Sequence, residues 1–131
     1  MVYWITGKKH CGKTTAALKL QRVLCSTSGR PIILDGDAVR HAMGSNADYS
    51  DEGRRMHQLT MASFASILEA QGFIVIISCV SPRRDVRKEC MKKFNESSLI
   101  YIRGGTLWPG TTYDEPGQDE PHQTYKGNEG E

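Results

Sequence analysis

Short apolar runs alternate along the chain with longer stretches in which apolar residues recur at helical spacing. Four runs have the length and the β-branched content of strands: Val2–Thr6, Ile32–Leu34, Phe73–Cys79 and Ser98–Ile102. Helical spacing predicts helices from Lys13 to Cys25, from Ala38 to Met43, from Ser50 to Gly72 and from Pro82 to about Lys93. Strands separated by helices predict an α/β fold with a parallel sheet.

Phe73–Cys79 lacks polar alternation, which is typical of a strand covered on both faces. We therefore expect a three-layer α/β/α arrangement around a parallel sheet of about four strands with flanking helices. The predicted N-caps are Asp37 for the short helix and Ser50 for the long one. The predicted buried stripe of the long helix consists of Met61, Phe64, Ala65 and Leu68.

The chain of 131 residues has room for one domain, and its last part differs from the rest. From Arg103 onward there are six glycines, three prolines, and six acidic against two basic side chains, a net charge of −4 that leaves +6 for the preceding residues. This composition predicts a folded domain over residues 1–116 and an acidic, disordered tail over residues 117–131. An excess of +6 suits an anionic ligand but is too small to indicate nucleic acid.

Composition also limits the location and the metal chemistry of the protein. No apolar run approaches the roughly 18 residues of a membrane span, and Val2–Ile5 follows Met1 without a basic segment or a cleavage site. A cytoplasmic protein is therefore expected, without membrane association. The four cysteines have neither CxxC spacing nor companion histidines at metal-ligand intervals, so we interpret them as reduced thiols.

Residues 7–14, GKKHCGKT, satisfy the phosphate-loop pattern G-x-x-x-x-G-K-[ST] between a predicted strand and a predicted helix. Such a loop surrounds phosphate with backbone amides at a helix N-terminus. Lys13 is expected to reach the β- and γ-phosphates of ATP, and the Thr14 hydroxyl is expected to ligate Mg²⁺. The predicted ATP-binding residues are Gly7, Lys8, Lys9, His10, Cys11, Gly12, Lys13, Thr14 and Thr15.

Polar residues that follow the other strands predict a second wall. Asp35 and Asp37 stand at the carboxyl end of a predicted parallel strand, where α/β proteins bind ligands, and Arg40 follows one helical turn later. Asp35 could hold the magnesium ion and Asp37 could accept a proton, or Asp37 could serve only as an N-cap. Arg54 and His57 share the inward side of the long helix, where the arginine needs either an internal carboxylate or the anion of a ligand.

Four segments together resemble adenylyl-sulfate kinases, in order and at about that family's spacing: GKKHCGKTT, LDGDAVRH, YSDEGRR and GFIVIISCVSPRRDVRKE. The resemblance covers roughly residues 2–102, and a later similarity extends it through Trp108 to Pro116. It implies a P-loop NTPase-type kinase fold and transfer of the γ-phosphate of MgATP to the 3′-hydroxyl of adenylyl sulfate, a step of sulfate assimilation. Small-molecule nucleotides would be the partners, with a homodimer possible.

Carried over by position, the resemblance implies a role for each matching residue. Lys13 and Asp37 would be catalytic, the aspartate by orienting or deprotonating the acceptor hydroxyl. Arg40 and Arg54 would hold the phosphosulfate group. The remaining expected substrate contacts are Tyr49 and Trp108 on the adenine, and His57, Val80 and Ser81 nearby.

The chain also departs from the family's pattern. His57 replaces an asparagine, and only Arg103–Leu107 stands where the family has a lid, so ATP should bind more weakly unless arginines or a neighbouring subunit compensate. The family's closing strand and helix are expected to be absent. Arg83, Arg84 and Arg87 are interpreted as solvated. Two further hypotheses stay open, a kinase for another nucleotide, nucleoside or polynucleotide acceptor, and a nucleotide-binding module without catalysis.

Overall fold

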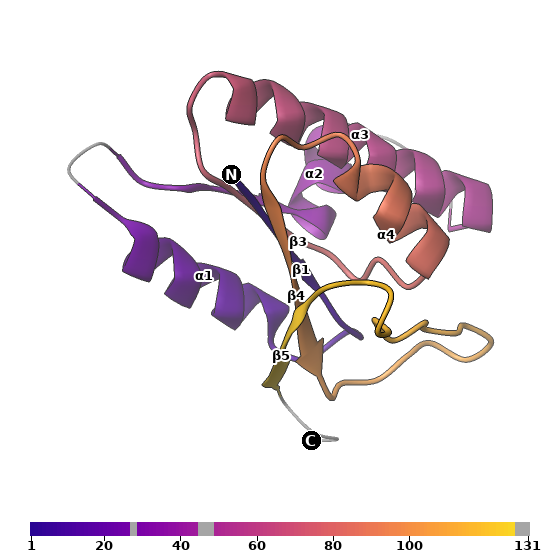
Figure 1. The fold of residues 1–131 in the computed structure, drawn as a ribbon. Helices are drawn as coiled ribbons and strands as arrows, with labels where there is room; N and C mark the ends of the chain where they lie inside the picture. The colour runs from indigo at the N-terminus through magenta and orange to yellow at the C-terminus, as the bar shows by residue number, and fades with distance from the viewer. Residues whose placement is uncertain (27–28, 45–48, 128–131) are drawn as a thin grey trace.

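The computed structural model describes residues 1–26, 29–44 and 49–127, which form one parallel sheet with helices on both faces (Figure 1). The five strands are β1 (Val2–Thr6), β2 (Ile32–Asp35), β3 (Val75–Ser78), β4 (Ser97–Arg103) and β5 (Gln123–Lys126). They pair in the order β2-β3-β1-β4-β5, each parallel to its neighbours. The helices are α1 (Lys13–Leu24), α2 (Gly36–Ala42), α3 (Asp51–Ala70) and α4 (Arg84–Met91).

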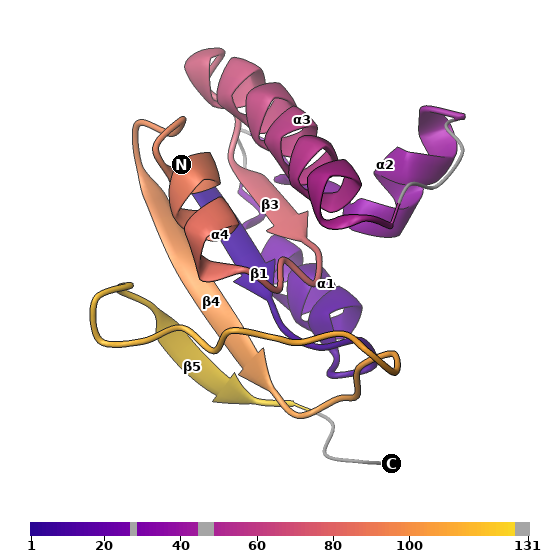
Figure 2. The same ribbon diagram turned by 90° about the vertical axis from the view of Figure 1, so that its right-hand side faces the viewer.

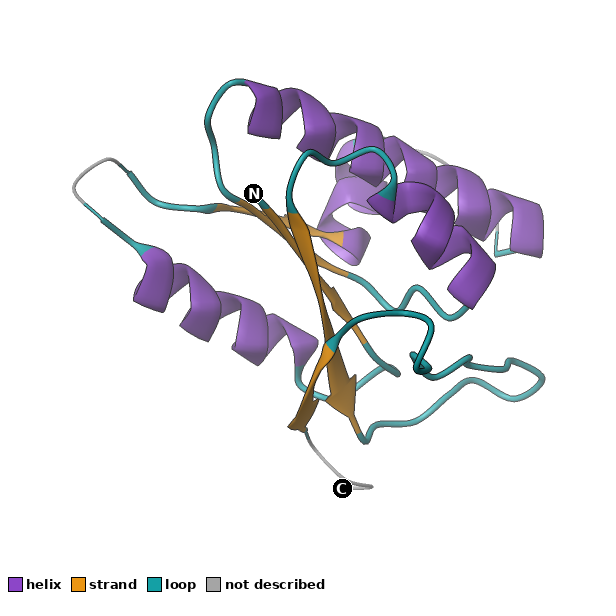
Figure 3. Cartoon of the chain, in the orientation of Figure 1, coloured by secondary structure: helices purple, strands orange, loops and turns teal. Residues whose placement is uncertain are grey.

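The sheet separates two apolar cores, which confirms the expected three layers. α1 lies on one face, while α3 and α4 cover the other, with α2 beside α3 (Figures 1 and 3). Alternate residues of one strand serve opposite cores, since Val75 and Ile77 pack with Trp4 and Met61 whereas Ile76 packs towards α1. All four residues of β3 are buried, as the unbroken apolar run predicts.

The expectation of about four strands and an irregular tail needs correction. β5 adds a fifth strand in the segment expected to be disordered, and it also supplies the closing strand expected to be absent. All of its residues, QTYK, are exposed at the sheet edge, so no apolar alternation announces it. Residues 128–131 lie outside the described residues. The division of the chain at residue 116 stays a prediction, although the residues beyond it include part of the sheet.

The segment between β4 and β5 passes along the carboxyl end of β1 and beneath α4 (Figure 2). The Tyr113 hydroxyl shares a 2.7 Å hydrogen bond with Thr6 Oγ1, and the Tyr113 ring stacks on Tyr101 at 5.8 Å between centroids. Glu120 of the expected acidic tail is buried and pairs with Arg87. The interpretation of Arg87 as solvated is therefore wrong, since its side chain is fully buried.

Local corrections concern where the helices begin and which face they bury. Asp35, not Asp37, caps α2 by accepting a 3.1 Å hydrogen bond from the Ala38 N–H. α4 begins two residues after Pro82. In α3, Phe64 is 42% exposed and Ala62 is buried in its place, because small residues let the helix approach the sheet closely. Ser50 caps α3 as expected. No helix in the described part of the chain has the length and apolar character of a membrane span.

We expect Ser50→Ala to lower the free energy of unfolding by about 1 kcal/mol, because the Ser50 hydroxyl accepts a hydrogen bond from the Gly53 N–H that the helix itself leaves unpaired. Ser50→Gly should lower the free energy of unfolding by only a few tenths of a kcal/mol. Urea denaturation measures the difference. Ser63→Ala, inside the same helix, is the control and should cause no loss. Equal effects at positions 50 and 63 would contradict the assigned cap.

Candidate functional site

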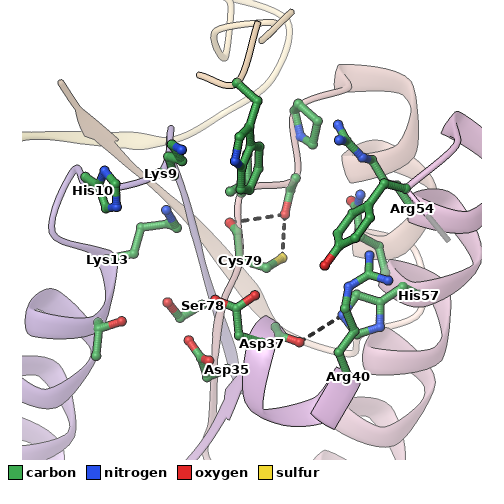
Figure 4. Close-up of a pocket in the computed structure, with 18 of the residues that line it drawn as sticks. Lys9, His10, Lys13, Asp35, Asp37, Arg40, Arg54, His57, Ser78 and Cys79 are labelled. Carbon is green, nitrogen blue, oxygen red and sulfur yellow. Dashed lines mark hydrogen bonds between the residues drawn. The ribbon is translucent and has the colours of Figure 1, made fainter. Parts of the chain in front are cut away.

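Parallel pairing brings the carboxyl ends of three strands to one edge of the sheet. Ser78 stands opposite both Ile5 of β1 and Asp35 of β2, so the loops that follow these strands begin side by side. A cleft of about 580 Å³ opens at this edge (Figure 4). The sequence-predicted residues that line it are Lys9, His10, Gly12, Lys13, Thr14, Thr15, Asp35, Asp37, Arg40, Tyr49, Arg54, His57, Val80, Ser81 and Trp108.

Three predicted ATP-binding residues, Gly7, Lys8 and Cys11, do not line this cleft. Cys11 is fully buried beneath the loop. The carbonyl oxygen of Lys8 accepts a 2.8 Å hydrogen bond from Lys13 Nζ, which holds the lysine across its own loop. These three residues therefore belong to the part of the loop that supports its shape, and they do not face the cleft.

The loop over residues 7–14 ends at the exposed N-terminus of α1. Gly12 occupies the N-cap position with a left-handed φ of +105°, and His10 also has a positive φ, of +64°. Within the described residues, no side chain caps α1 and no acidic residue lies in its first turn. The N–H groups and the positive helix end are thus available to an anion.

The segment after β4 supports this loop. The Thr106 N–H donates a 2.9 Å hydrogen bond to the Lys9 carbonyl oxygen. Gly105 has a φ of +77°, and a Cβ there would meet the Lys9 carbonyl oxygen and the Cys11 backbone. Lys9 Nζ lies 4.5 Å from the centre of the Trp108 ring, a cation–π distance. The short connection from Arg103 to Leu107 is therefore fixed to the phosphate loop.

The acidic residues of the second wall have different surroundings. Asp35 at the end of β2 uses one carboxylate oxygen to cap α2, and Asp37 follows in the first turn of that helix. Figure 4 shows both beneath the space between Lys13 and Arg40. Gly36 lies between them, where a Cβ would come within 3.0 Å of the Cys79 Cβ, so the close approach of α2 to the β3 end depends on this glycine.

His57 joins α3 to α2. Its Nε2 lies 3.0 Å from the carbonyl oxygen of Gly36. Burial and the nearby Arg40 guanidinium lower the pKa of His57, against smaller opposing effects of the Gly36 hydrogen bond and the Asp37 charge. The uncharged imidazole is therefore the favoured form at neutral pH, and it adds no positive charge to this wall.

The two guanidinium groups of the second wall lie near the same aromatic ring. The Arg40 and Arg54 guanidinium groups lie 4.8 and 5.9 Å from the centre of the Tyr49 ring, and both residues lie across the cleft from the phosphate loop (Figure 4). Among the described residues neither guanidinium forms an ion pair. The described residues thus provide no internal carboxylate as a partner for Arg54. Residues 45–48 lie outside the described residues.

The Val80–Ser81 turn closes the cleft behind the β3 end. Thr6 Oγ1 donates a 2.7 Å hydrogen bond to the Val80 carbonyl oxygen, and Trp4 Nε1 donates a 2.8 Å bond to Ser81 Oγ. Ser81 has a φ of +46°, which is uncommon for a residue with a side chain. Burial raises the pKa of Cys79 to about 11, so its thiol stays protonated at neutral pH.

Sequence reasoning missed several residues that line the cleft: Gly36, Gln58, Ser78 and Cys79. Gln58 Oε1 and Ser78 Oγ are buried without a hydrogen-bond partner among the described residues. Gln58 stands four residues after Arg54, a spacing that could have placed it on the same inward face. Ser78 lies inside an apolar run, where no sequence signal marks it as exceptional.

The oxygen donors at the floor of the cleft are suited to a magnesium ion. Mg²⁺ is usually held by one or two carboxylates together with substrate phosphates and water. Thr14 and Asp35 offer a hydroxyl and a carboxylate, and the unpartnered Ser78 Oγ stands on the neighbouring strand end. No group of three or more His, Cys, Asp or Glu in the described residues could hold a metal without further ligands. The residues present thus fit a metal that arrives with a nucleotide.

The adenylylsulphate kinase family matches residues 1–126. The chain belongs to this family. Among curated relatives, a probable adenylyl-sulfate kinase of Archaeoglobus fulgidus is 39% identical over 102 residues, which are 78% of this chain and 66% of the relative. Another, from Pyrococcus abyssi, is 34% identical over 99 residues, or 76% of this chain and 57% of the relative. The chain thus spans between about half and two thirds of these relatives.

Solved structures confirm the fold of this family. The Mycobacterium tuberculosis APS kinase CysC, solved in complex with AMPPNP and APS, has a TM-score of 0.79 at 18% identity and covers 95% of this chain and 87% of its own. At that identity the likeness establishes the P-loop kinase fold, and the roles of single residues are argued below from the geometry of the cleft.

We expect Gly105→Ala to destabilise the protein more than Gly72→Ala. Both glycines have a positive φ, which costs a residue with a Cβ about 1 to 2 kcal/mol, but only a Cβ at position 105 meets the phosphate loop. Overpacking there should add about 1 to 3 kcal/mol. Thermal unfolding measures both losses, and binding of a non-hydrolysable ATP analogue should weaken only in Gly105→Ala. Identical losses and affinities would contradict the support of the loop by Gly105.

The lowered pKa of His57 predicts a pH dependence of stability. A histidine whose pKa falls on folding binds fewer protons in the folded state, so the free energy of unfolding rises with pH between the folded pKa and about 6.5. Urea denaturation at pH 5.5 and 7.5 should therefore show a larger gain on raising the pH for the wild type than for His57→Asn. Replacement of the exposed His41 by asparagine is the control. Equal gains in the wild type and His57→Asn would contradict the expectation.

Proposed function

We propose that this protein transfers the γ-phosphate of ATP to the 3′-hydroxyl of adenylyl sulfate. One observation carries the proposal: the phosphate loop and the wall of Asp37, Arg40 and Arg54 face each other across a single cleft (Figure 4). The loop would hold a triphosphate on one side, and on the other side two guanidinium groups that form no ion pair among the described residues would hold a second anionic molecule. Membership of the adenylylsulphate kinase family supports the identity of the second molecule.

On the phosphate side, Lys13 is the residue whose amine would contact the transferring phosphoryl group. Its amine now donates to the Lys8 carbonyl oxygen and lies in the cleft, so a short movement would bring it to the β- and γ-phosphates. The N–H groups at the uncapped start of α1 would hold the same phosphates. Together they would stabilise the charge that spreads over the transferring phosphoryl group.

On the acceptor side, Asp37 would orient or deprotonate the 3′-hydroxyl. Asp35 already accepts the hydrogen bond that caps α2, whereas Asp37 is not the cap. The two carboxylates therefore differ in the role left open to them. Arg40 and Arg54 would hold the phosphosulfate group through charge-assisted hydrogen bonds. His57, uncharged beside them, would add a hydrogen-bonding group without a further cation.

The adenine of the acceptor would lie between two aromatic side chains. Tyr49 and Trp108 both line the cleft and are 55% and 46% exposed, so their rings are open to a base. Stacking on each ring should contribute about 1 to 3 kcal/mol. The cation–π contacts with Arg40 and Lys9 orient these rings before the base arrives.

Magnesium forms part of the proposal as the ion that accompanies ATP. Thr14 and Asp35 would hold it, and it would neutralise charge on the β- and γ-phosphates. Production of 3′-phosphoadenylyl sulfate would assign the protein to sulfate assimilation, with small-molecule nucleotides as partners in the cytoplasm. A homodimer stays an expectation, which the half-exposed Met56, Phe64 and Ile67 of α3 support.

We expect Lys13→Ala and Asp37→Asn each to lower phosphate transfer by about 100-fold or more, because each removes a group that acts on the reacting atoms. ATP labelled in its γ-phosphate, with adenylyl sulfate as acceptor, measures transfer, and circular dichroism checks the fold. Lys19→Ala, on the exposed side of α1, is the matched control and should leave the rate unchanged.

Two results would contradict this function. Unchanged turnover in Lys13→Ala or Asp37→Asn would remove the proposed mechanism. Transfer to another nucleotide, a nucleoside or a polynucleotide end, but not to adenylyl sulfate, would replace the acceptor. Calorimetric titration with adenylyl sulfate and with a non-hydrolysable ATP analogue then separates a binding module from an enzyme, since a module would bind both without transfer.

A further inference from the structure

Arg87 of α4 forms a buried ion pair behind the cleft. Its Nε and Nη2 donate hydrogen bonds of 2.8 and 3.0 Å to the two carboxylate oxygens of Glu120. The guanidinium group is fully buried and the carboxylate nearly so. Two further bonds reach the backbone, from Nη1 to the Ser81 carbonyl oxygen at 2.7 Å and from Nη2 to the Asp114 carbonyl oxygen at 2.6 Å.

These two carbonyl groups belong to segments that form or support the acceptor side of the cleft. Ser81 lines the cleft, and its positive φ needs surroundings that hold it in place. Asp114 follows Tyr113, whose hydroxyl bonds to Thr6, and the Asp114 N–H donates a 2.7 Å bond to the Pro82 carbonyl oxygen. One guanidinium group therefore joins the Val80–Ser81 turn to the segment that leads from Trp108.

We propose that Arg87 and Glu120 are positioning residues for the acceptor. Glu120 neutralises the buried guanidinium and fixes its plane, and the guanidinium in turn fixes the Ser81 and Asp114 carbonyl groups. The Val80–Ser81 turn and the Trp108 segment are thereby held at one separation, which is the width available to the acceptor. Neither residue lines the cleft, so neither touches the substrate. The inference rests on the proposed function, because it assigns the acceptor to this side.

The energetics of buried ion pairs favour positioning over stabilisation. Desolvation of two charges offsets much of their attraction, and apolar residues of similar volume often replace such a pair without loss of stability. What apolar residues lack are donors aimed at two separate carbonyl groups. A double replacement with apolar residues can therefore keep the fold while it removes the bonds to Ser81 and Asp114.

The chain offers a matched control for the experiment. Lys88 and Asp119 form a 2.6 Å ion pair that joins the same two segments, α4 and the chain before β5, but both side chains are exposed. Among the described residues, neither side chain forms a hydrogen bond with Ser81 or Asp114. Loss of this pair should weaken the link between the segments without moving the turn.

The first measurement determines the steady-state kinetics of three variants. They are the apolar double variant Arg87→Met/Glu120→Leu, the single variant Arg87→Lys, and the control double variant Lys88→Gln/Asp119→Asn. We expect the KM for adenylyl sulfate to rise at least about 10-fold in both Arg87 variants, since the acceptor loses its preformed site. The KM for ATP should stay within about twofold of the wild-type value, because the phosphate loop has its own supports. The control should match the wild type in both constants.

The second measurement reports on the turn without any need for activity. The Trp4 indole N–H donates to Ser81 Oγ, and the chain has one other tryptophan, so Trp108→Phe assigns the two indole resonances in a nitrogen–proton correlation spectrum. The Trp4 resonance should shift in Arg87→Lys and in the apolar double variant, but not in the control. The midpoint of thermal unfolding is measured for every variant, so that a general loss of stability can be recognised.

Three outcomes decide the matter. An unmoved Trp4 resonance and an unchanged acceptor KM in Arg87→Lys overturn the inference, whether or not the apolar double variant folds. Equal rises in both KM values with a fallen thermal midpoint also overturn it, since they indicate general support of the fold. If the wild type does not phosphorylate adenylyl sulfate but the Trp4 resonance follows Arg87, the proposed function fails while the control of the turn by Arg87 stands.

Discussion

Parallel pairing of β1, β2 and β3 is the constraint on which the whole cleft depends. β1, β2 and β3 end at the same edge, which places Ile5, Ser78 and Asp35 side by side although they are far apart in the sequence. β1 then continues into α1 on one face, whereas β3 continues into α4 on the other (Figure 1). When the connections after two neighbouring strands run to opposite faces of the sheet, a crevice forms between those connections. Ligands of α/β proteins bind in such crevices.

The two sides of this crevice are stabilised by different physical means. The phosphate loop is shaped by backbone: positive φ angles at His10 and Gly12, and close packing of Gly105 against Lys9. The side around the β3 end is shaped by side chains, since Thr6, Trp4 and Arg87 all form hydrogen bonds with the Val80–Ser81 turn. Backbone N–H groups suit the phosphates, since they can bind any such anion. Side chains, by contrast, can adapt the opposite wall to a particular second molecule.

Sequence reasoning reached the fold class, the phosphate loop and most of the second wall, because apolar periodicity and local motifs report on neighbours in the chain. It failed where the decisive partner is distant. Arg87 is expected in solvent until Glu120, 33 residues later, is known to lie beside it. β5 escapes detection because an exposed edge strand has no apolar face. Asp35 and Asp37 flank one glycine, and the spacing alone does not tell which of them accepts the Ala38 N–H.

The central place of β1 in the sheet has a consequence for synthesis of the protein. Both neighbours of β1 follow much later, since β3 begins at Val75 and β4 at Ser97. A ribosome adds about 5 to 20 residues per second, so the first strand waits on the order of 4 to 14 seconds for its first partner. During that interval Trp4 and Ile5, both buried in the finished fold, lack the neighbouring strands that cover them. Molecular chaperones that bind nascent apolar segments would have a target in this strand.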